Sequence, residues 1–188
     1  MMYPIDINKY MNHKMIFHDD EFGKCNELLD EVGLCSDPKR HWGKKSCFEG
    51  RYFTCFGVEF MSPPICCDNY DNTSCNGQKI EIKKGLYHAI HYIGYCDIGR
   101  FRESVLLQNQ NMTIGESTIF FYDWGIKGNT VRSYDIKDDS CKIALVDEKD
   151  YENDYLFMYS AKIDAKEFDT LLLPHNPFVH IIAITIEG

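Results

Sequence analysis

The residues best suited to recognise a ligand are aromatic side chains that stand among charged or amide side chains in turn-like segments. Such rings can stack on the C–H face of a sugar, and neighbouring carboxylates or carboxamides can bond its hydroxyl groups. One ring stands in segment 40–43, one in the Asn- and Asp-rich segment 66–77, and two flank segment 96–100. The alternative role of these rings is to cap the ends of a hydrophobic core. The candidate ligand-binding residues are Trp42, Tyr70, Tyr95, Asp97 and Arg100, with Phe101 beside them.

Cysteine is the second residue type that could do chemistry. The chain has nine cysteines, and an odd number cannot be fully paired within one chain. Cys66 and Cys67 are adjacent and Cys75 follows closely, so these three are the candidates for disulfides or for cross-links between molecules. The chain has no Cys-x-x-Cys spacing, which disfavours a structural zinc site. The alternative is that the thiols are reduced and buried as small apolar side chains.

Two segments have the composition of a metal site, and both have a simpler explanation. Segment 68–72 (Asp-Asn-Tyr-Asp-Asn) offers hard oxygen ligands for calcium, but such residues also form turns by default. His88 and His91 are three positions apart in a predicted strand, so we expect them to point to opposite faces and not to share a metal. We predict no metal and no cofactor, with calcium in segment 68–72 as the open alternative.

Catalytic arrangements are missing from the sequence. The acidic pairs at 19–20 and 138–139 are expected to be solvated, no nucleophile turn pairs a serine or cysteine with a histidine, and no glycine-rich phosphate loop occurs. The 20 basic and 29 acidic residues give a net charge of −9, which opposes binding to nucleic-acid phosphates. No apolar run approaches the length of a membrane span, and residues 1–6 do not resemble a signal peptide. We therefore expect a protein that is not an enzyme, binds no nucleic acid and has no membrane span.

The chain is predicted to fold into β-strands with almost no helix. The chain is rich in aromatic residues, with twelve Tyr, twelve Phe and two Trp, and this composition favours strands. Short apolar or alternating segments separated by turn-forming residues are typical of a β-sandwich. The predicted strands are 50–60, 79–82, 86–95, 101–108, 117–124, 155–163, 168–173 and 179–186, with turns at 83–85 and 109–111 and one helical turn at 26–32.

The last predicted strand marks the centre of the fold. Residues 179–186 are apolar on both faces except for His180 and Thr185, and such a strand belongs inside a packed structure. Pro174 and Pro177 cannot donate to a strand ladder, so we expect them to form a rigid corner before it. Because the length suits one domain and no linker composition divides the chain, we predict a single domain over 1–188, with 179–186 and 86–93 as central strands.

Six short motifs occur in an order that resembles a known family. They are residues 6–12 (DINKYMN), 57–60 (GVEF), 76–82 (NGQKIEI), 85–94 (GLYHAIHYIG), 123–124 (DW) and 173–177 (LPHNP). Together they resemble bacterial galactose-binding-like jelly-roll domains, which are similar to carbohydrate-binding modules and accompany glycoside hydrolases or stand alone in Gram-positive spore formers. The chain departs from that family at 109–111, where relatives commonly have an Asp-Gly hairpin, and in its number of cysteines. The resemblance implies an all-β jelly-roll β-sandwich of two antiparallel sheets, without catalytic activity.

Two functions remain open. The first is a non-catalytic carbohydrate-binding module that uses aromatic residues of its end loops, and the resemblance favours it. The second is a self-assembling structural protein of a spore or cell surface, in which cysteines cross-link copies of the chain. The odd number of cysteines and the lack of a signal peptide favour the second function. Both are consistent with synthesis in the cytoplasm, and a spore- or cell-surface destination stays open.

Overall fold

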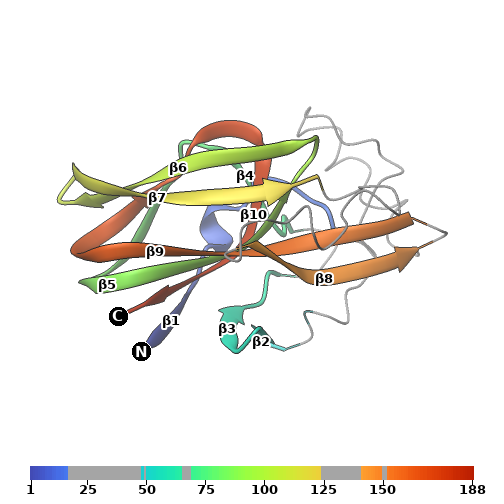
Figure 1. Ribbon diagram of the computed structural model, residues 1–188, viewed down its shortest axis with the longest axis horizontal. Helices are drawn as coiled ribbons and strands as arrows, with labels where there is room; N and C mark the ends of the chain where they lie inside the picture. The colour runs from blue at the N-terminus through green and yellow to red at the C-terminus, as the bar shows by residue number, and fades with distance from the viewer. Residues whose placement is uncertain (17–47, 49, 65–68, 124–140, 150–151) are drawn as a thin grey trace.

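The computed structural model describes residues 1–16, 48, 50–64, 69–123, 141–149 and 152–188, most of which lie in β-strands (Figure 1). No helix within these ranges is long and apolar enough to cross a membrane. A short 3₁₀ helix, η1 (Asn8–Tyr10), follows the first strand. The strands are β1 (Met2–Ile5), β2 (Tyr52–Cys55), β3 (Val58–Met61), β4 (Thr73–Asn76), β5 (Lys79–Cys96), β6 (Arg100–Asn109), β7 (Met112–Tyr122), β8 (Cys141–Lys149), β9 (Glu152–Leu172) and β10 (His175–Glu187).

Antiparallel pairing joins these strands into two sheets of unequal size. Eight strands form the large sheet, in the order β1-β10-β5-β9-β6-β7, with β4 paired to β10 and β8 paired to β9. The hairpin of β2 and β3 forms the small sheet. In Figure 1 the β6–β7 hairpin lies on one side of β5 and β9, and the β2–β3 hairpin lies on the other side. The predicted antiparallel β-sandwich is confirmed.

The two strands predicted to be central occupy that position. Strand β10 pairs with β5 along one edge and with β4 and β1 along the other, and β5 lies between β10 and β9. Residues 179–186 are all buried. The proline corner is only partly as predicted, because β10 begins at His175 and includes Pro177. The pairing of β10 with β4 shifts register between Asn176 and His180, so Pro177 lies where the regular ladder is interrupted.

One predicted turn and one predicted break between strands are register shifts within long strands. Residues 83–85 were expected to turn the chain, but they lie inside β5, where its pairing with β9 shifts register between Glu81 and Gly85. A second register shift, between Tyr87 and Ala89 of β5, lies opposite residues 163–165 of β9. The sequence pattern predicted two separate strands where β9 continues without a break. A bulge adds residues and bends a strand without ending it. Strand β5 therefore passes through a segment that has the local composition of a turn, and β9 joins two segments that were predicted as separate strands.

Other differences concern the shorter strands. Segment 50–60, predicted as one strand, contains a tight turn at Phe56 and Gly57, whose φ angles are 47° and 79°. This left-handed pair separates β2 from β3 as a hairpin. Strand β4 lies in the segment predicted to be a polar loop, and β8 lies in a segment for which no strand was predicted. The predicted helical turn at 26–32 lies outside the described residues.

Both faces of the central strands are covered by apolar side chains. The larger hydrophobic cluster includes Tyr92 from β5, Phe121 from β7 and Phe157 from β9. The smaller cluster brings Phe60 of the β2–β3 hairpin together with Tyr95. Because successive side chains of a strand point to opposite faces, one strand can supply both clusters. This explains why the sequence of β10 is apolar on both faces.

Candidate functional site

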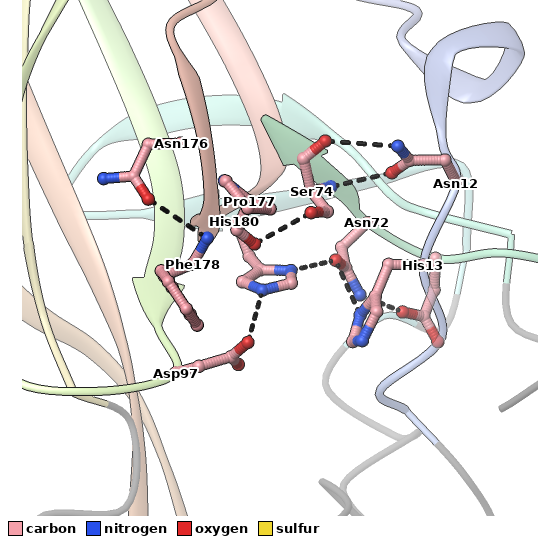
Figure 2. A network of polar contacts seen from close by, with 10 residues as sticks. Asn12, His13, Asn72, Ser74, Asp97, Asn176, Pro177, Phe178 and His180 are labelled. Atoms are coloured by element: carbon pink, nitrogen blue, oxygen red, sulfur yellow. Dashed lines mark hydrogen bonds and ion pairs between the residues drawn. The ribbon is translucent and has the colours of Figure 1, made fainter. Parts of the chain in front are cut away.

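A buried network of polar side chains joins four segments that are far apart in the sequence (Figure 2). It connects residues 12–16 near the N-terminus, residues 71–74 around the start of β4, residues 95–97 at the end of β5, and residues 176–180 of β10. Buried polar groups need hydrogen-bond partners, because an unsatisfied group loses its hydration without compensation. The polar residues in these otherwise apolar segments therefore pair with one another.

His180 lies at the centre of this network and is 0% exposed. Its Nδ1 atom is 2.8 Å from Oδ1 of Asn72, and its Nε2 atom is 2.9 Å from Oδ2 of Asp97. The ring of Tyr95 stacks on the imidazole, with 4.5 Å between the centroids and 8° between the planes. His180 thus links β10 to the residue that follows β5 and to the residue that precedes β4.

A second histidine, His13, approaches the same amide oxygen. Its Nδ1 atom is 3.1 Å from Oδ1 of Asn72, and its ring centroid is 4.5 Å from that of His180. The Nδ2 group of Asn72 donates to Asp71 at 2.8 Å, which fixes the orientation of the amide. Because Oδ1 can only accept, the Nδ1 atoms of both histidines carry a hydrogen.

The other ring nitrogen of His13 has no such partner. Its Nε2 atom is buried and makes no hydrogen bond. Burial lowers the pKa of His13 to about 3, and the neighbouring His180 adds to the effect. A neutral imidazole with a hydrogen on Nδ1 leaves Nε2 as a bare acceptor. His13 is therefore held in its neutral form.

Asp71 anchors the N-terminal segment. Its carboxylate accepts bonds from the backbone N–H groups of Met15 (3.0 Å) and Ile16 (2.8 Å), from Asn72, and from the ammonium group of Lys14 at 3.1 Å. Burial raises the pKa of the Asp71 carboxyl, and Lys14 opposes this effect. Four donors use the four lone-pair positions of a carboxylate. Asp71 is therefore unsuited to the calcium site that segment 68–72 suggested, since the Lys14 ammonium already supplies the positive charge.

Ser74 and Asn12 complete the connection between the N-terminus and β10. The Asn12 side chain both donates to and accepts from the backbone of Ser74, at 3.2 Å and 2.8 Å. The Ser74 hydroxyl in turn donates to the carbonyl of Pro177 at 2.8 Å. Near the same strand end, the backbone N–H of Asp97 donates to the carbonyl of Phe178 at 3.0 Å. The backbone around Phe178 is consequently fixed by the network from two sides.

A partly exposed surface lies next to this network. The rings of Phe101 and Phe178 are half-buried and parallel, with 6.2 Å between centroids and 7° between planes. The Asn176 side chain donates to Oε1 of Glu103 at 2.6 Å and accepts from the Phe178 backbone N–H at 3.2 Å. Figure 2 shows Asn176 and Phe178 at the edge of the network, with Phe178 the nearer of the two to Asp97. We call Phe101, Glu103, Asn176 and Phe178 the Phe101–Phe178 surface.

The structure places the predicted ligand-binding residues in different environments. Tyr95 was expected to expose its ring, which is wrong, because the ring is 0% exposed and covers His180. Asp97 is buried and paired with His180, whereas Arg100 is exposed at the start of β6. Tyr70 is half-buried against the larger cluster. Trp42 lies outside the described residues.

The structure also corrects one of the predicted cross-link residues. Cys75 is a free thiol with 0% exposure, so it cannot reach a neighbouring molecule. Burial, with Cys96 and Glu103 nearby, strongly raises the pKa of the Cys75 thiol. Cys66 and Cys67 lie outside the described residues.

Phe178, Asn176 and Glu103 were missed in the sequence. Asn176 and Phe178 flank the second proline of the predicted corner, and an Asn-Pro-Phe sequence at the start of a buried strand was the available signal. Glu103 alternates with apolar residues on β6, as an ordinary surface residue of a strand would. Only its hydrogen bond with Asn176 makes it a candidate binding residue. Such a contact between residues 73 positions apart cannot be read from local pattern.

His88 and His91 behave differently from the prediction. The Nε2 atoms of both rings lie 3.6 Å from oxygen atoms of the Glu187 carboxylate, so the two side chains approach the same group. The register shift between Tyr87 and Ala89 interrupts the regular alternation at His88. Burial lowers the pKa of His91, and Glu187 opposes this effect. In the part of the chain that is described, no group of three such side chains is arranged to hold a metal ion.

The large antiparallel sheet and the small sheet of β2 and β3 define the protein as a β-sandwich domain. Residues 50–188 match the sequence profile of the family described as the AziU2-like beta-sandwich domain, and the chain belongs to this family. No curated protein matches the chain significantly. The family match supports the β-sandwich that the sequence motifs implied, but not the galactose-binding-like family in particular.

Proposed function

We propose that this domain is a non-catalytic binding module that holds a carbohydrate on the Phe101–Phe178 surface. The observation that carries the proposal is the parallel pair of half-buried rings beside a bonded carboxylate and carboxamide. Aromatic faces supply apolar contact to the C–H groups of a sugar, and polar side chains at their edge bond its hydroxyls. Glu103 offers acceptors and Asn176 offers both a donor and an acceptor.

The position of this surface supports a role in recognition. It lies at the end of β5 and the starts of β6 and β10, where segment 96–100 connects two strands. Loops and strand ends held by a rigid scaffold are common places for binding residues. The buried bonds of Asp97 with Phe178 and His180 would hold the surface in place, which reduces the entropy lost when a ligand binds.

The histidine and carboxylate beneath the surface favour a structural role over a catalytic one. The His180–Asp97 pair has the composition of a general base and its orienting carboxylate. However, His180 is 0% exposed and both of its ring nitrogens are engaged, with Asn72 and Asp97. A substrate could not approach either nitrogen without displacing the core.

The cysteine-linked assembly suggested by the sequence gains no support from the described thiols. Cys55, Cys75 and Cys96 are buried. An assembly of this kind would have to use other cysteines, such as the adjacent Cys66 and Cys67. We therefore place the carbohydrate-binding function first.

A glycan array followed by calorimetric titration of any ligand found would test the proposal. We expect Phe178→Ala to weaken binding at least tenfold, because it removes one of the two stacked rings. Glu103→Gln should weaken binding less, since the amide keeps one acceptor. Phe56→Ala is the matched control, because Phe56 is an exposed ring in the β2–β3 turn. Failure to bind any glycan, or equal affinity of the Phe178→Ala variant and the wild type, would overturn the proposal.

A further inference from the structure

We propose that the bridge formed by His13, Asn72 and His180, here called the histidine latch, opens when His13 is protonated, and that opening loosens the Phe101–Phe178 surface. The first part concerns the fold alone. The second part, in which an acidic solution releases the ligand, rests on the proposed function. Both parts follow from the positions of the two rings around one amide oxygen.

The latch has no room for a second hydrogen on His13. Oδ1 of Asn72 already accepts from Nδ1 of both rings, and the buried Nε2 atom of His13 makes no hydrogen bond. A proton added at Nε2 would be a buried donor without an acceptor. It would also place a positive charge in a ring whose centroid is 4.5 Å from that of His180. Protonation therefore favours an arrangement in which His13 leaves this position.

The charged groups around the latch do not relieve this cost. Asp97, after β5, is already bonded to Nε2 of His180. Asp71, before β4, is saturated by four donors that include the Lys14 ammonium. The ring of Tyr95 from β5 covers His180 and offers no charge. Neither carboxylate is free to pair with a protonated His13.

Opening of the latch affects the proposed binding surface through short connections. Four backbone bonds join residues 12–13 to residues 71–72, and they lie directly beside the His13 ring. The N-terminal segment is tied through Asn12 and Ser74 to the carbonyl of Pro177, next to Phe178. His180 and Asp97 hold the other side of Phe178. Release of His13 would remove one of the two supports of the Phe178 backbone.

The size of the effect follows from the two pKa values of His13. The pKa is about 3 in the latched state, and an imidazole released into water has its ordinary value of 6.5. Protons therefore favour the open state by a factor of about 30 at pH 5 relative to pH 7.5. A change of this size is large enough to measure by hydrogen exchange.

Amide hydrogen exchange, measured by NMR at pH 7.5 and pH 5.0 and corrected for intrinsic rates, tests the latch without any ligand. The amides of Asn12, His13, Asp71 and Asn72 bond across the latch. We expect their protection to fall about 30-fold at pH 5.0, while amides paired between β6 and β7 keep theirs. The variant His13→Gln keeps a donor for Asn72 but cannot be protonated, so its loss of protection should be under about threefold. His88→Gln replaces an exposed histidine and should behave as the wild type.

Three outcomes would overturn the latch. The first is an equal loss of amide protection at pH 5.0 in the latch and in β6–β7. The second is a loss of protection in His13→Gln that is as large as in the wild type. The third needs no variant: ring ¹⁵N shifts of wild-type His13 that titrate near pH 6.5 in the folded protein would contradict a buried neutral ring. We expect these shifts to report a neutral ring down to pH 4.

Titration of the array ligand at the same two pH values tests the coupling. We expect the wild type to bind more weakly at pH 5.0 and His13→Gln to lose less affinity. If ligand affinity does not change with pH while the latch amides still lose protection selectively, the latch opens without affecting the Phe101–Phe178 surface. That result would overturn the second part of the proposal and support the first. Absence of any glycan binding would instead overturn the proposed function. The exchange experiment needs no ligand, so it would still decide whether the latch exists.

Discussion

The ring of Tyr95 lies flat on the ring of His180, with centroids 4.5 Å apart and planes 8° apart. Both side chains are 0% exposed. The register of β5 and β10 places these two residues directly opposite each other, so the stack is a cross-strand pair. The same aromatic ring belongs to the smaller hydrophobic cluster beneath the β2–β3 hairpin. Tyr95 therefore joins the polar network to the core.

Replacement of Tyr95 tests this role. Tyr95→Ala should lower the free energy of unfolding by about 3–5 kcal/mol, because it removes a fully buried ring and leaves a cavity beside His180. Tyr95→Phe keeps the stacked ring and should cost less than about 1.5 kcal/mol. Urea unfolding followed by fluorescence measures both. A loss below about 1 kcal/mol in Tyr95→Ala would mean that the ring is not a part of the packed core.

The buried ion pair of Lys14 and Asp71 should be essential to the N-terminal segment. Asp71→Asn removes the charge that balances a buried ammonium group and puts an amide donor against backbone N–H groups. We expect a loss of about 3–5 kcal/mol in the free energy of unfolding. Glu81→Gln is the control, because the pair of Glu81 with Lys9 has a similar distance but is exposed and should contribute nothing measurable. Equal stability of Asp71→Asn and Glu81→Gln would contradict the stabilising role of the buried Lys14–Asp71 pair.

The sequence was sufficient to predict the strands whose own pattern is decisive. Strand β10 is apolar on both faces and β6 alternates, and both were predicted near their observed bounds. The bulge at residues 83–85 could not be predicted, because Lys-Lys-Gly has the local composition of a turn. Pairing with β9 on both sides of this segment keeps it in the strand. Tertiary contacts thus overrode the local signal.

The candidate site was less predictable than the fold. Tyr95 precedes a turn-like segment, so its ring could have been exposed or buried. Its burial depends on the β2–β3 hairpin, which the sequence presented as one strand. The network around His180 depends on Asn72 and Asp97, which are 108 and 83 positions away. Partners at such separations are set by the packing of strands and leave no local pattern.

The described thiols should be inert in the folded protein. Burial raises the pKa of Cys55 to about 11, and it raises the pKa of Cys75 further. Because the thiolate is the reactive form, Cys55, Cys75 and Cys96 should resist iodoacetamide at pH 8 and react after denaturation. Peptide mapping by mass spectrometry measures the modification at each position. Rapid modification of native Cys75, or its recovery in a disulfide, would contradict its buried free state.

The β6–β7 hairpin offers a stabilising substitution. Asn109 pairs with Met112, and the two residues between them, Gln110 and Asn111, have φ angles of 52° and 64°. Glycine adopts this left-handed conformation without the steric penalty of a side chain. Asn111→Gly should therefore raise the free energy of unfolding by roughly 0.5 kcal/mol, whereas Asn111→Val should lower it by about 1–2 kcal/mol. Equal thermal midpoints of the two variants would show that the turn does not impose this conformation.

The lowered pKa of His13 makes the stability of the whole domain depend on pH. Between pH 6.5 and about pH 3 the unfolded chain binds a proton at this histidine that the folded chain does not bind. Stability is therefore greatest above pH 6.5 and falls as the pH is lowered through this range. The burial of His91 acts in the same direction, whereas the raised pKa of Asp71 acts in the opposite direction.

The contribution of His13 is isolated by comparison with a variant that cannot titrate at this position. From pH 7.5 to pH 5.0 the wild type should lose about 2 kcal/mol more in the free energy of unfolding than His13→Gln. Urea unfolding at both pH values measures this difference, and His88→Gln serves as the control for an exposed histidine. The two proteins would show the same pH dependence if the His13 ring were open to water. A smaller loss in His13→Gln would instead show that the folded state excludes a proton from this ring, as its position between Asn72 and His180 requires.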